Sequence, residues 1–362
     1  MSTKKFGGIF TRNPSMESST FNILLALIAV TLVLVLILTC TGCVALFNTD
    51  FLGKLDNVIP SGDSGNNPFK ENIEINIPLD LDNADTISEN NISSERAMLV
   101  DVTAGKIVAS RKGTQMMYPA SLTKIMTLIV VVENLTSEDD LDHVLTIEDQ
   151  SGENSGYGFK VGEKLTVRDL LYAVILRSDG QACLTLAKYI AGSEAAFVKL
   201  MNQKVKELGL LEGDPETNPS TNFTNCTGLH DTYHYSTCYD MAIITAYAME
   251  NTLCSSIFNS LSHKPSDNFR PGESHTFWHK VLHEYLKDGS KQPGTATILG
   301  GKTGWTGSES GFCMAYYIKG DDGHYYVLIT SNVPTSNILK AADTEKAIND
   351  AFYICDTYIK AN

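Results

Sequence analysis

The sequence predicts a mixed α/β fold of the α+β kind, with strands near both ends of the folded part and helices between them. Two short apolar runs, 97–102 and 106–110, are separated by a glycine-containing turn and predict a β-hairpin. Two longer runs of alternating character, 311–318 and 324–331, predict a second antiparallel pair. An amphipathic helix over 343–359 follows them and can cover one face of the sheet.

Helical patterns fill the middle of the chain. A helix over 165–176 has apolar residues at helical spacing, and Thr166 or a neighbour caps its start. It stops before Asp179 and Gly180, so Ser178 lies on a tight connection to the next helix. Further helices are expected over 181–191, 195–208, 239–249 and 275–286.

The apolar helix that begins within residues 118–124 carries the clearest chemical signal. Ser121 lies in its first turn, where unpaired amides and the helix dipole favour developing negative charge. Lys124 is three residues further and shares a face with Ser121, so a desolvated amine there can take the hydroxyl proton. A capped helix with a surface lysine is the alternative interpretation of this short motif alone.

The amino-terminal part predicts a membrane anchor. An uncharged, apolar stretch over 21–47 is long enough to cross a bilayer, and the basic residues before it predict that residues 1–20 form a cytoplasmic tail. A cleaved signal peptide normally has a shorter apolar region, so the length favours an uncleaved anchor. Cleavage and lipid attachment at Cys43 are the alternatives.

A polar segment separates the predicted anchor from the folded part. Residues 48–94 are rich in Asn, Asp, Ser and Gly, which predicts a flexible extracytoplasmic stalk. One folded domain is expected over 95–362, and the sequence holds no internal repeat.

Charge and cysteine content exclude some classes of protein. The formal net charge of −14 argues against a nucleic-acid surface. Eight cysteines are present, but two lie in the apolar stretch and the others are scattered, with Cys226 and Cys238 the nearest pair. We expect mostly buried thiols with room for one bridge, and the spacing shows no Cys-x-x-Cys metal signature.

Three short motifs occur in a fixed order: Ser121-x-x-Lys124, Ser178-Asp179-Gly180, and Lys302-Thr303-Gly304 at the expected start of a strand. Together they resemble the serine-type D-alanyl-D-alanine carboxypeptidases, the low-molecular-weight penicillin-binding proteins. The likeness runs from about residue 94 to residue 359. It implies a β-lactamase/transpeptidase-like fold: a five-stranded antiparallel sheet flanked by helices, plus a helical subdomain, with the site between the sheet edge and the helices.

The resemblance also implies catalytic roles. Ser121 attacks the peptide carbonyl between two D-alanines, Lys124 is the general base, and Ser178 relays the proton toward the leaving amine. An acyl-enzyme forms, and water then releases it.

Substrate-binding roles follow from the third motif. Lys302 supplies positive charge, and Thr303 binds the terminal carboxylate of the substrate. The oxyanion hole uses the backbone N–H groups of Ser121 and Trp305, where removing one such donor typically costs about 3 kcal/mol. The implied function is removal of the terminal D-alanine from peptidoglycan stem peptides ending in D-Ala-D-Ala. β-Lactam antibiotics are then acylating inhibitors, no cofactor or metal is needed, and the expected location is the bacterial cell membrane, with a single span and an extracytoplasmic domain.

The middle motif departs from the family pattern Ser-x-Asn. Gly180 stands where the asparagine amide orients the substrate carbonyl and the neighbouring lysine. Asp179, Gln181 or a water molecule are the candidates to fill this place. Otherwise a charge-assisted contact of roughly 1.5–3 kcal/mol is missing, which slows the enzyme by one or two decades.

Gly180 also motivates an alternative function, a non-catalytic wall-binding or scaffold protein that keeps the fold. A third interpretation is a secreted β-lactamase, which needs an additional deacylating carboxylate. No Glu-x-x-Leu-Asn stretch occurs between Ser178 and Lys302, so the sequence disfavours it.

Two other patterns have weaker interpretations. The residues Gly300 to Thr303 resemble the end of a phosphate-binding loop, but Ala296 occupies the place of its first glycine. Histidines at 275, 279 and 283 recur every four residues, which predicts one partly exposed helix face rather than a zinc site. His234 is expected to be a structural hydrogen-bonding residue rather than a base.

Overall fold

The computed structural model describes residues 67–148, 156–210, 220–286 and 291–360. The predicted cytoplasmic tail, the predicted membrane span and residues 48–66 of the predicted stalk lie outside these ranges. Within the described ranges, no helix has both the length and the apolar character needed to cross a bilayer.

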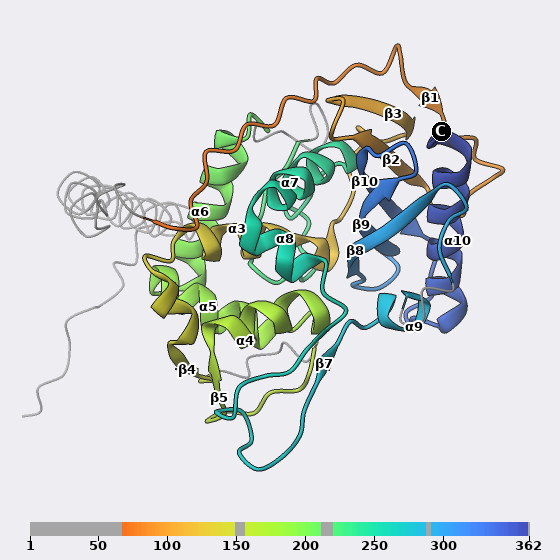
Figure 1. Ribbon diagram of the computed structural model, residues 1–362. Helices are drawn as coiled ribbons and strands as arrows, with labels where there is room; N and C mark the ends of the chain where they lie inside the picture. Colours follow the sequence, from red (N-terminus) through yellow and green to blue (C-terminus); the bar gives the residue numbers. More distant parts are fainter. Residues whose placement is uncertain (1–66, 149–155, 211–219, 287–290, 361–362) are drawn as a thin grey trace, which may run out of the picture. The chain divides into compact units, whose positions relative to one another are not determined.

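One six-stranded sheet organises the described residues (Figure 1). Its strand order is β1-β3-β2-β10-β9-β8. The strands are β1 (Asp85–Thr86), β2 (Arg96–Asp101), β3 (Lys106–Arg111), β8 (Ala296–Gly304), β9 (Phe312–Gly320) and β10 (Tyr325–Val333). The last five pair antiparallel, as expected, and the two-residue β1 adds a parallel sixth strand at the edge beside β3.

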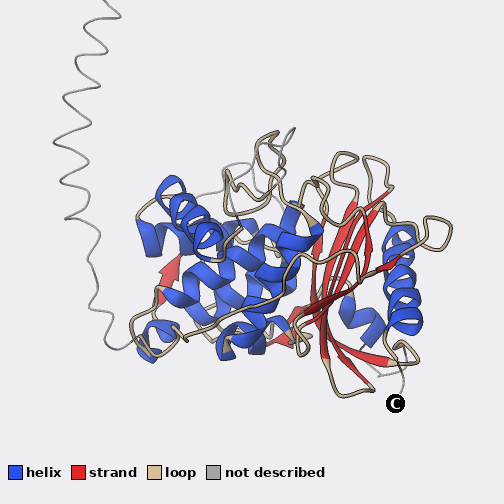
Figure 2. Ribbon diagram, turned by 90° about the horizontal axis from the view of Figure 1, so that it is seen from above, coloured by secondary structure: helices blue, strands red, loops and turns tan. Residues whose placement is uncertain are grey.

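Alternation along the strands separates two hydrophobic cores. On β9, Cys313, Ala315 and Tyr317 belong to the core under the helical part, whereas Met314 and Tyr316 belong to the core on the other face. Helix α10 (Ala341–Tyr358) covers that second face, as its amphipathic pattern predicts, and Figure 2 shows helices on both sides of the sheet.

The helical part surrounds α3 (Thr123–Glu133), which is buried over almost its whole length. The other elements of this part are η2 (Glu138–Asp142), α4 (Val167–Tyr172), the π-helical turn η3 (Ala173–Arg177), α5 (Gly180–Ala191), α6 (Glu194–Glu207), α7 (Cys238–Glu250) and α8 (Thr252–Phe258), with the hairpin of β4 (Val144–Thr146) and β5 (Lys164–Thr166). The Thr166 hydroxyl accepts the Asp169 N–H, so the predicted cap of α4 is confirmed.

The prediction of a flexible stalk over 48–94 is wrong for residues 67–94, and the folded domain begins before residue 95. This segment, which we call the strap, buries Phe69 and Ile77 in the core of the helical part. Asn251 Nδ2 donates to the Phe69 carbonyl at 2.7 Å, and the Tyr239 hydroxyl donates to the Ile77 carbonyl at 2.7 Å. A few widely spaced apolar residues are therefore enough to pack this polar segment onto the domain, because side chains from distant parts of the sequence form hydrogen bonds with its backbone.

Both ends of the strap are held. At its start, Asn67 Nδ2 donates to the carbonyl of Glu133, the last residue of α3, at 2.6 Å. At its end, the buried Asp350 carboxylate of α10 accepts from the N–H groups of Ser93 and Ser94 at 2.8 and 2.7 Å, and from the Ser94 hydroxyl.

The helix predicted over 275–286 is also wrong. Residues 277 and 278 form strand β7 (Phe277–Trp278), which pairs with β6 (Ser262–His263), and only α9 (Leu282–Leu286) is helical. The three histidines therefore do not share a helix face. His279 is buried and shares a 2.9 Å hydrogen bond with the Gly301 carbonyl, while His275 contacts the Tyr157 hydroxyl.

Candidate active site

Ser121 lies in η1 (Ala120–Leu122), a single 3₁₀ turn that leads directly into α3. Lys124 Nζ donates to Ser121 Oγ at 3.2 Å, as the spacing of three residues predicts, and to the Thr227 carbonyl at 2.5 Å. The Lys124 side chain is buried, whereas Ser121 is partly exposed. The hydroxyl therefore meets solvent while its amine partner is held in the protein interior.

Two glycines allow close approach to the Ser121 backbone. Ala120 has a φ of +47°, a strained value for a residue with a side chain. A Cβ atom on Gly228, whose φ is +84°, would lie 1.9 Å from the Ala120 carbonyl oxygen and 2.9 Å from Ser121 N. A Cβ atom on Gly304 would lie 3.2 Å from Ser121 N. The loop at Gly228 and the end of β8 thus both pack closely against the backbone of Ser121.

A second serine–lysine pair joins the helical part to the sheet. Ser178 follows η3 with a left-handed φ of +56°, and Lys302 Nζ donates to its Oγ at 2.8 Å and to the Thr303 carbonyl at 2.7 Å. Lys302 is completely buried, and this burial lowers its pKa well below the usual range, with the nearby charge of Lys124 adding to the shift. The two pairs are therefore close enough to interact electrostatically.

The Lys302-Thr303-Gly304 motif was expected at the start of a strand. It lies instead at the end of strand β8. Thr303 is 8% exposed. Trp305 follows the strand, and its indole N–H donates to Thr335 Oγ1 at 3.0 Å. The oxyanion roles of the Ser121 and Trp305 N–H groups remain predictions.

The side chains beside Gly180 have different surroundings. Asp179 caps α5: its Oδ1 accepts the Ala182 N–H at 2.9 Å and its Oδ2 accepts the Tyr157 N–H at 2.7 Å. Burial raises the pKa of the Asp179 carboxyl. Gln181 is 4% exposed, and among the described residues neither polar atom of its side chain has a hydrogen-bond partner.

No sequence pattern distinguishes the Thr227 carbonyl, and Gly228 is one of 27 glycines with no motif around it. His234, expected to be structural, shares a 2.7 Å hydrogen bond with Thr123 Oγ1 through Nε2 and accepts the Thr224 N–H through Nδ1. Burial lowers its pKa to about 3, so the ring is neutral at physiological pH and its Nε2 carries the proton. His234 therefore holds the first turn of α3 in place.

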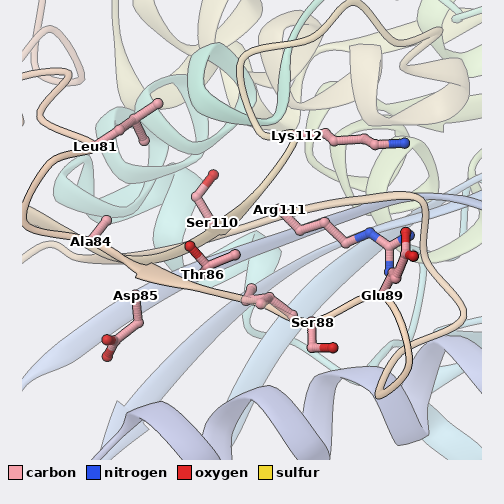
Figure 3. Close-up of a pocket in the computed structure, with 10 residues that line it drawn as sticks. Leu81, Ala84, Asp85, Thr86, Ser88, Glu89, Ser110, Arg111 and Lys112 are labelled. Atoms are coloured by element: carbon pink, nitrogen blue, oxygen red, sulfur yellow. The ribbon is translucent and has the colours of Figure 1, made fainter.

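A surface depression of about 450 Å³ lies at the opposite edge of the sheet (Figure 3). It is lined by residues 84–89 of the strap and residues 110–112 at the end of β3. None of the motif residues lines it, so it is separate from the two serine–lysine pairs.

A serine before a buried helix, together with a sheet-edge lysine that donates to a second serine, is the arrangement that the resemblance to penicillin-binding proteins and DD-transpeptidases implies. Solved structures confirm that fold. Penicillin binding protein 5 from Haemophilus influenzae aligns with a TM-score of 0.59 at 24% identity, covering 75% of this chain and 71% of that one. The Streptomyces K15 DD-transpeptidase aligns with a TM-score of 0.58 at 22% identity, covering 74% and 98%.

The chain belongs to the peptidase S11 family, whose model, described as D-alanyl-D-alanine carboxypeptidase, matches residues 83–323. It is 30% identical over 269 residues to the D-alanyl-D-alanine carboxypeptidase DacF of Bacillus subtilis, covering 73% of this chain and 64% of that protein. It is 33% identical over 168 residues to DacC of Escherichia coli, covering 44% and 40%. The chain thus spans less than two thirds of either relative.

Proposed function

We propose that the protein is a serine-type D-alanyl-D-alanine carboxypeptidase that removes the terminal D-alanine from peptidoglycan stem peptides and is acylated by β-lactams. One observation carries this proposal: the buried Lys124 amine lies 3.2 Å from the partly exposed Ser121 hydroxyl. A lysine in that position can accept the serine proton as Oγ bonds to the carbonyl carbon. The C–N bond to the leaving D-alanine then breaks, and Ser178 passes a proton to the departing amine.

The function is tested on the full-length protein in detergent. Incubation with benzylpenicillin is expected to add the mass of one penicilloyl group, and a D-Ala-D-Ala peptide is expected to release D-alanine. A Ser121→Ala variant is the control and should show neither. If wild-type protein of normal thermal stability forms no adduct and releases no D-alanine, the catalytic assignment fails.

A second candidate, a wall-binding or scaffold protein with little turnover, is favoured by the surroundings of Gly180. Asp179 is committed to two backbone N–H groups, and the Gln181 amide has no partner, so no described side chain provides the amide contact of the family pattern. This function predicts a Ser121-dependent penicillin adduct without release of D-alanine.

A Gly180→Asn variant tests whether Gly180 limits turnover. The φ of Gly180 is not positive, so its backbone accepts a side chain. An amide there restores one charge-assisted contact, and we expect kcat/KM for D-alanine release to rise by about 10- to 100-fold. Steady-state kinetics of D-alanine release, beside Gln181→Asn as a control one position further on, measure the change. An unchanged or lower rate contradicts the assignment of Gly180 as a catalytic deficit.

The proposed location is the outer side of a bacterial cell membrane. Its support is the apolar stretch 21–47 and the basic residues that precede it. The partners are then the membrane itself and peptidoglycan stem peptides ending in D-Ala-D-Ala.

A further inference from the structure

The turn that carries Ser178 has an uncommon backbone conformation. The φ of Ser178 is +56°, in the left-handed region, which a residue with a side chain adopts only where its surroundings hold it there. From the sheet, Lys302 Nζ donates to the Ser178 hydroxyl at 2.8 Å. The contacts that hold the backbone of the turn come from its neighbours in the sequence, Arg177 and Asp179.

Both neighbours of Ser178 contact the same residue, Tyr157. The Arg177 guanidinium lies 5.7 Å from the centre of the Tyr157 ring, and Asp179 Oδ2 accepts the Tyr157 N–H at 2.7 Å. The Tyr157 hydroxyl shares a 2.9 Å hydrogen bond with His275 Nδ1, which fixes the far end of the ring. Tyr157 is therefore joined to the chain immediately before and immediately after Ser178.

The backbone beside Tyr157 fits tightly against Asp179, which is completely buried. Gly156 has a φ of +114°, and a Cβ atom on it would lie 2.5 Å from Asp179 Cα and 2.6 Å from Asp179 Cγ. Gly158 also has a positive φ, +81°, but no atom lies within 4 Å of the position of its Cβ. The close approach to Asp179 thus requires a glycine at position 156, whereas the space beside Gly158 is open.

The two carboxylate oxygens of Asp179 have separate partners. Oδ1 accepts the Ala182 N–H at 2.9 Å and caps α5, whereas Oδ2 bonds Tyr157. A cap needs only one oxygen: the Ser193 hydroxyl caps α6 by accepting the Ala196 N–H at 3.2 Å. Since burying a carboxylate is costly unless its oxygens are bonded, the second oxygen of Asp179 is explained by the link to Tyr157 and not by the cap.

We infer that Asp179 and Tyr157 are positioning residues that hold the Ser178 hydroxyl where it passes a proton to the leaving amine. This inference rests on the proposed carboxypeptidase function. Lys302 fixes the Ser178 side chain from the sheet, and the bond between Asp179 and Tyr157 fixes its backbone from the helical part. Both residues act through Ser178, so their loss slows the chemical step more than it weakens substrate binding.

An Asp179→Asn variant of the full-length protein breaks the link and keeps the cap. Asparagine retains one oxygen for the Ala182 N–H, but its amide nitrogen cannot accept the Tyr157 N–H. We expect acylation of Ser121 by benzylpenicillin and kcat for D-alanine release each to fall by about 10- to 100-fold, with KM changed less than about threefold. Ser193→Ala removes the cap of α6 and should lower thermal stability without slowing acylation. An unchanged acylation rate in Asp179→Asn overturns the inference.

Two glycine variants test the same link from the side of Tyr157. Gly156→Ala and Gly158→Ala both place a side chain on a backbone of positive φ, but only the first pushes against Asp179. We expect Gly156→Ala to slow acylation by about tenfold or more, and Gly158→Ala to stay within about threefold of wild type. Equal acylation rates in the two variants contradict the role of the contact.

A double-mutant cycle with Ser178→Ala shows whether Asp179 acts through Ser178. Once the Ser178 hydroxyl is gone, Asp179→Asn should slow acylation no further, because no hydroxyl remains to be positioned. A loss in the double variant equal to the sum of both losses in free energy overturns the inference. Acylation needs no release of D-alanine, so the cycle still decides the role of Asp179 if wild-type protein forms an adduct but releases no D-alanine. Wild-type protein that forms no adduct contradicts both the proposed function and this inference.

Discussion

Replacing Lys124 by methionine is expected to lower the rate of Ser121 acylation by about 10³- to 10⁴-fold, the upper range for loss of a positioned general base. Methionine keeps the apolar stem of the side chain, which is buried, but it removes the amine that donates to Ser121 Oγ and to the Thr227 carbonyl. The serine then has no described group within hydrogen-bond distance to accept its proton. Stopped-flow or quenched mass measurement of benzylpenicillin acylation gives the rate.

A second variant controls for the loss of one positive charge in Lys124→Met. Lys199→Met removes the same formal charge from an exposed position on α6 and should leave acylation unchanged. Thermal unfolding of both variants shows whether the fold is retained. An acylation rate within tenfold of wild type in a folded Lys124→Met protein would falsify the role of Lys124 as the base.

The second large effect is expected from Gly228→Ala, a single added methyl group. That carbon would lie 1.9 Å from the Ala120 carbonyl oxygen, a separation that atoms do not tolerate, so the loop or the η1 turn must move. The Thr227 carbonyl, which accepts the Lys124 amine, moves with the loop. Displacing catalytic groups by about 1 Å costs roughly 10²-fold in rate, and we expect acylation to fall by at least that factor.

Backbone strain alone must be separated from this clash. Gly192 has a similar φ of +76°, against +84° for Gly228, but no atom lies within 4 Å of the position its Cβ would take. Gly192→Ala therefore imposes the same conformational cost without displacing Ser121. Both variants should lose thermal stability, while only Gly228→Ala should lose acylation. Equal acylation in the two variants contradicts the role of the Gly228 loop in positioning Ser121 and Lys124.

Local patterns predicted most elements of this fold because the relevant forces act over short distances. The alternating strands β9 and β10, the capped start of α4 and the contact of Lys124 with Ser121 all depend on residues within four positions of one another. The placement of Ser178 on a tight connection is confirmed by its left-handed backbone after η3.

The errors have a common physical origin in contacts between distant residues. The local pattern predicted a helix over 275–286, but the pairing of β7 with β6 and the bond of His279 to Gly301 override it. The ordered strap was not predicted because its sequence is polar. Its backbone is held by hydrogen bonds to Asn251 and Asp350, which lie more than 150 residues away in the sequence. The Thr227 carbonyl was missed because any residue can present a carbonyl.

The hydrogen bond of Asn67 to Glu133 places the start of the strap and Ser121 near opposite ends of α3. The described chain begins at the carboxyl end of α3, where Asn67 bonds Glu133, whereas Ser121 precedes the amino end of the same helix. Eleven residues of helix place these ends about 16 Å apart. The strap therefore starts at the end of α3 opposite to the end that leads to Ser121, about one helix length from the serine.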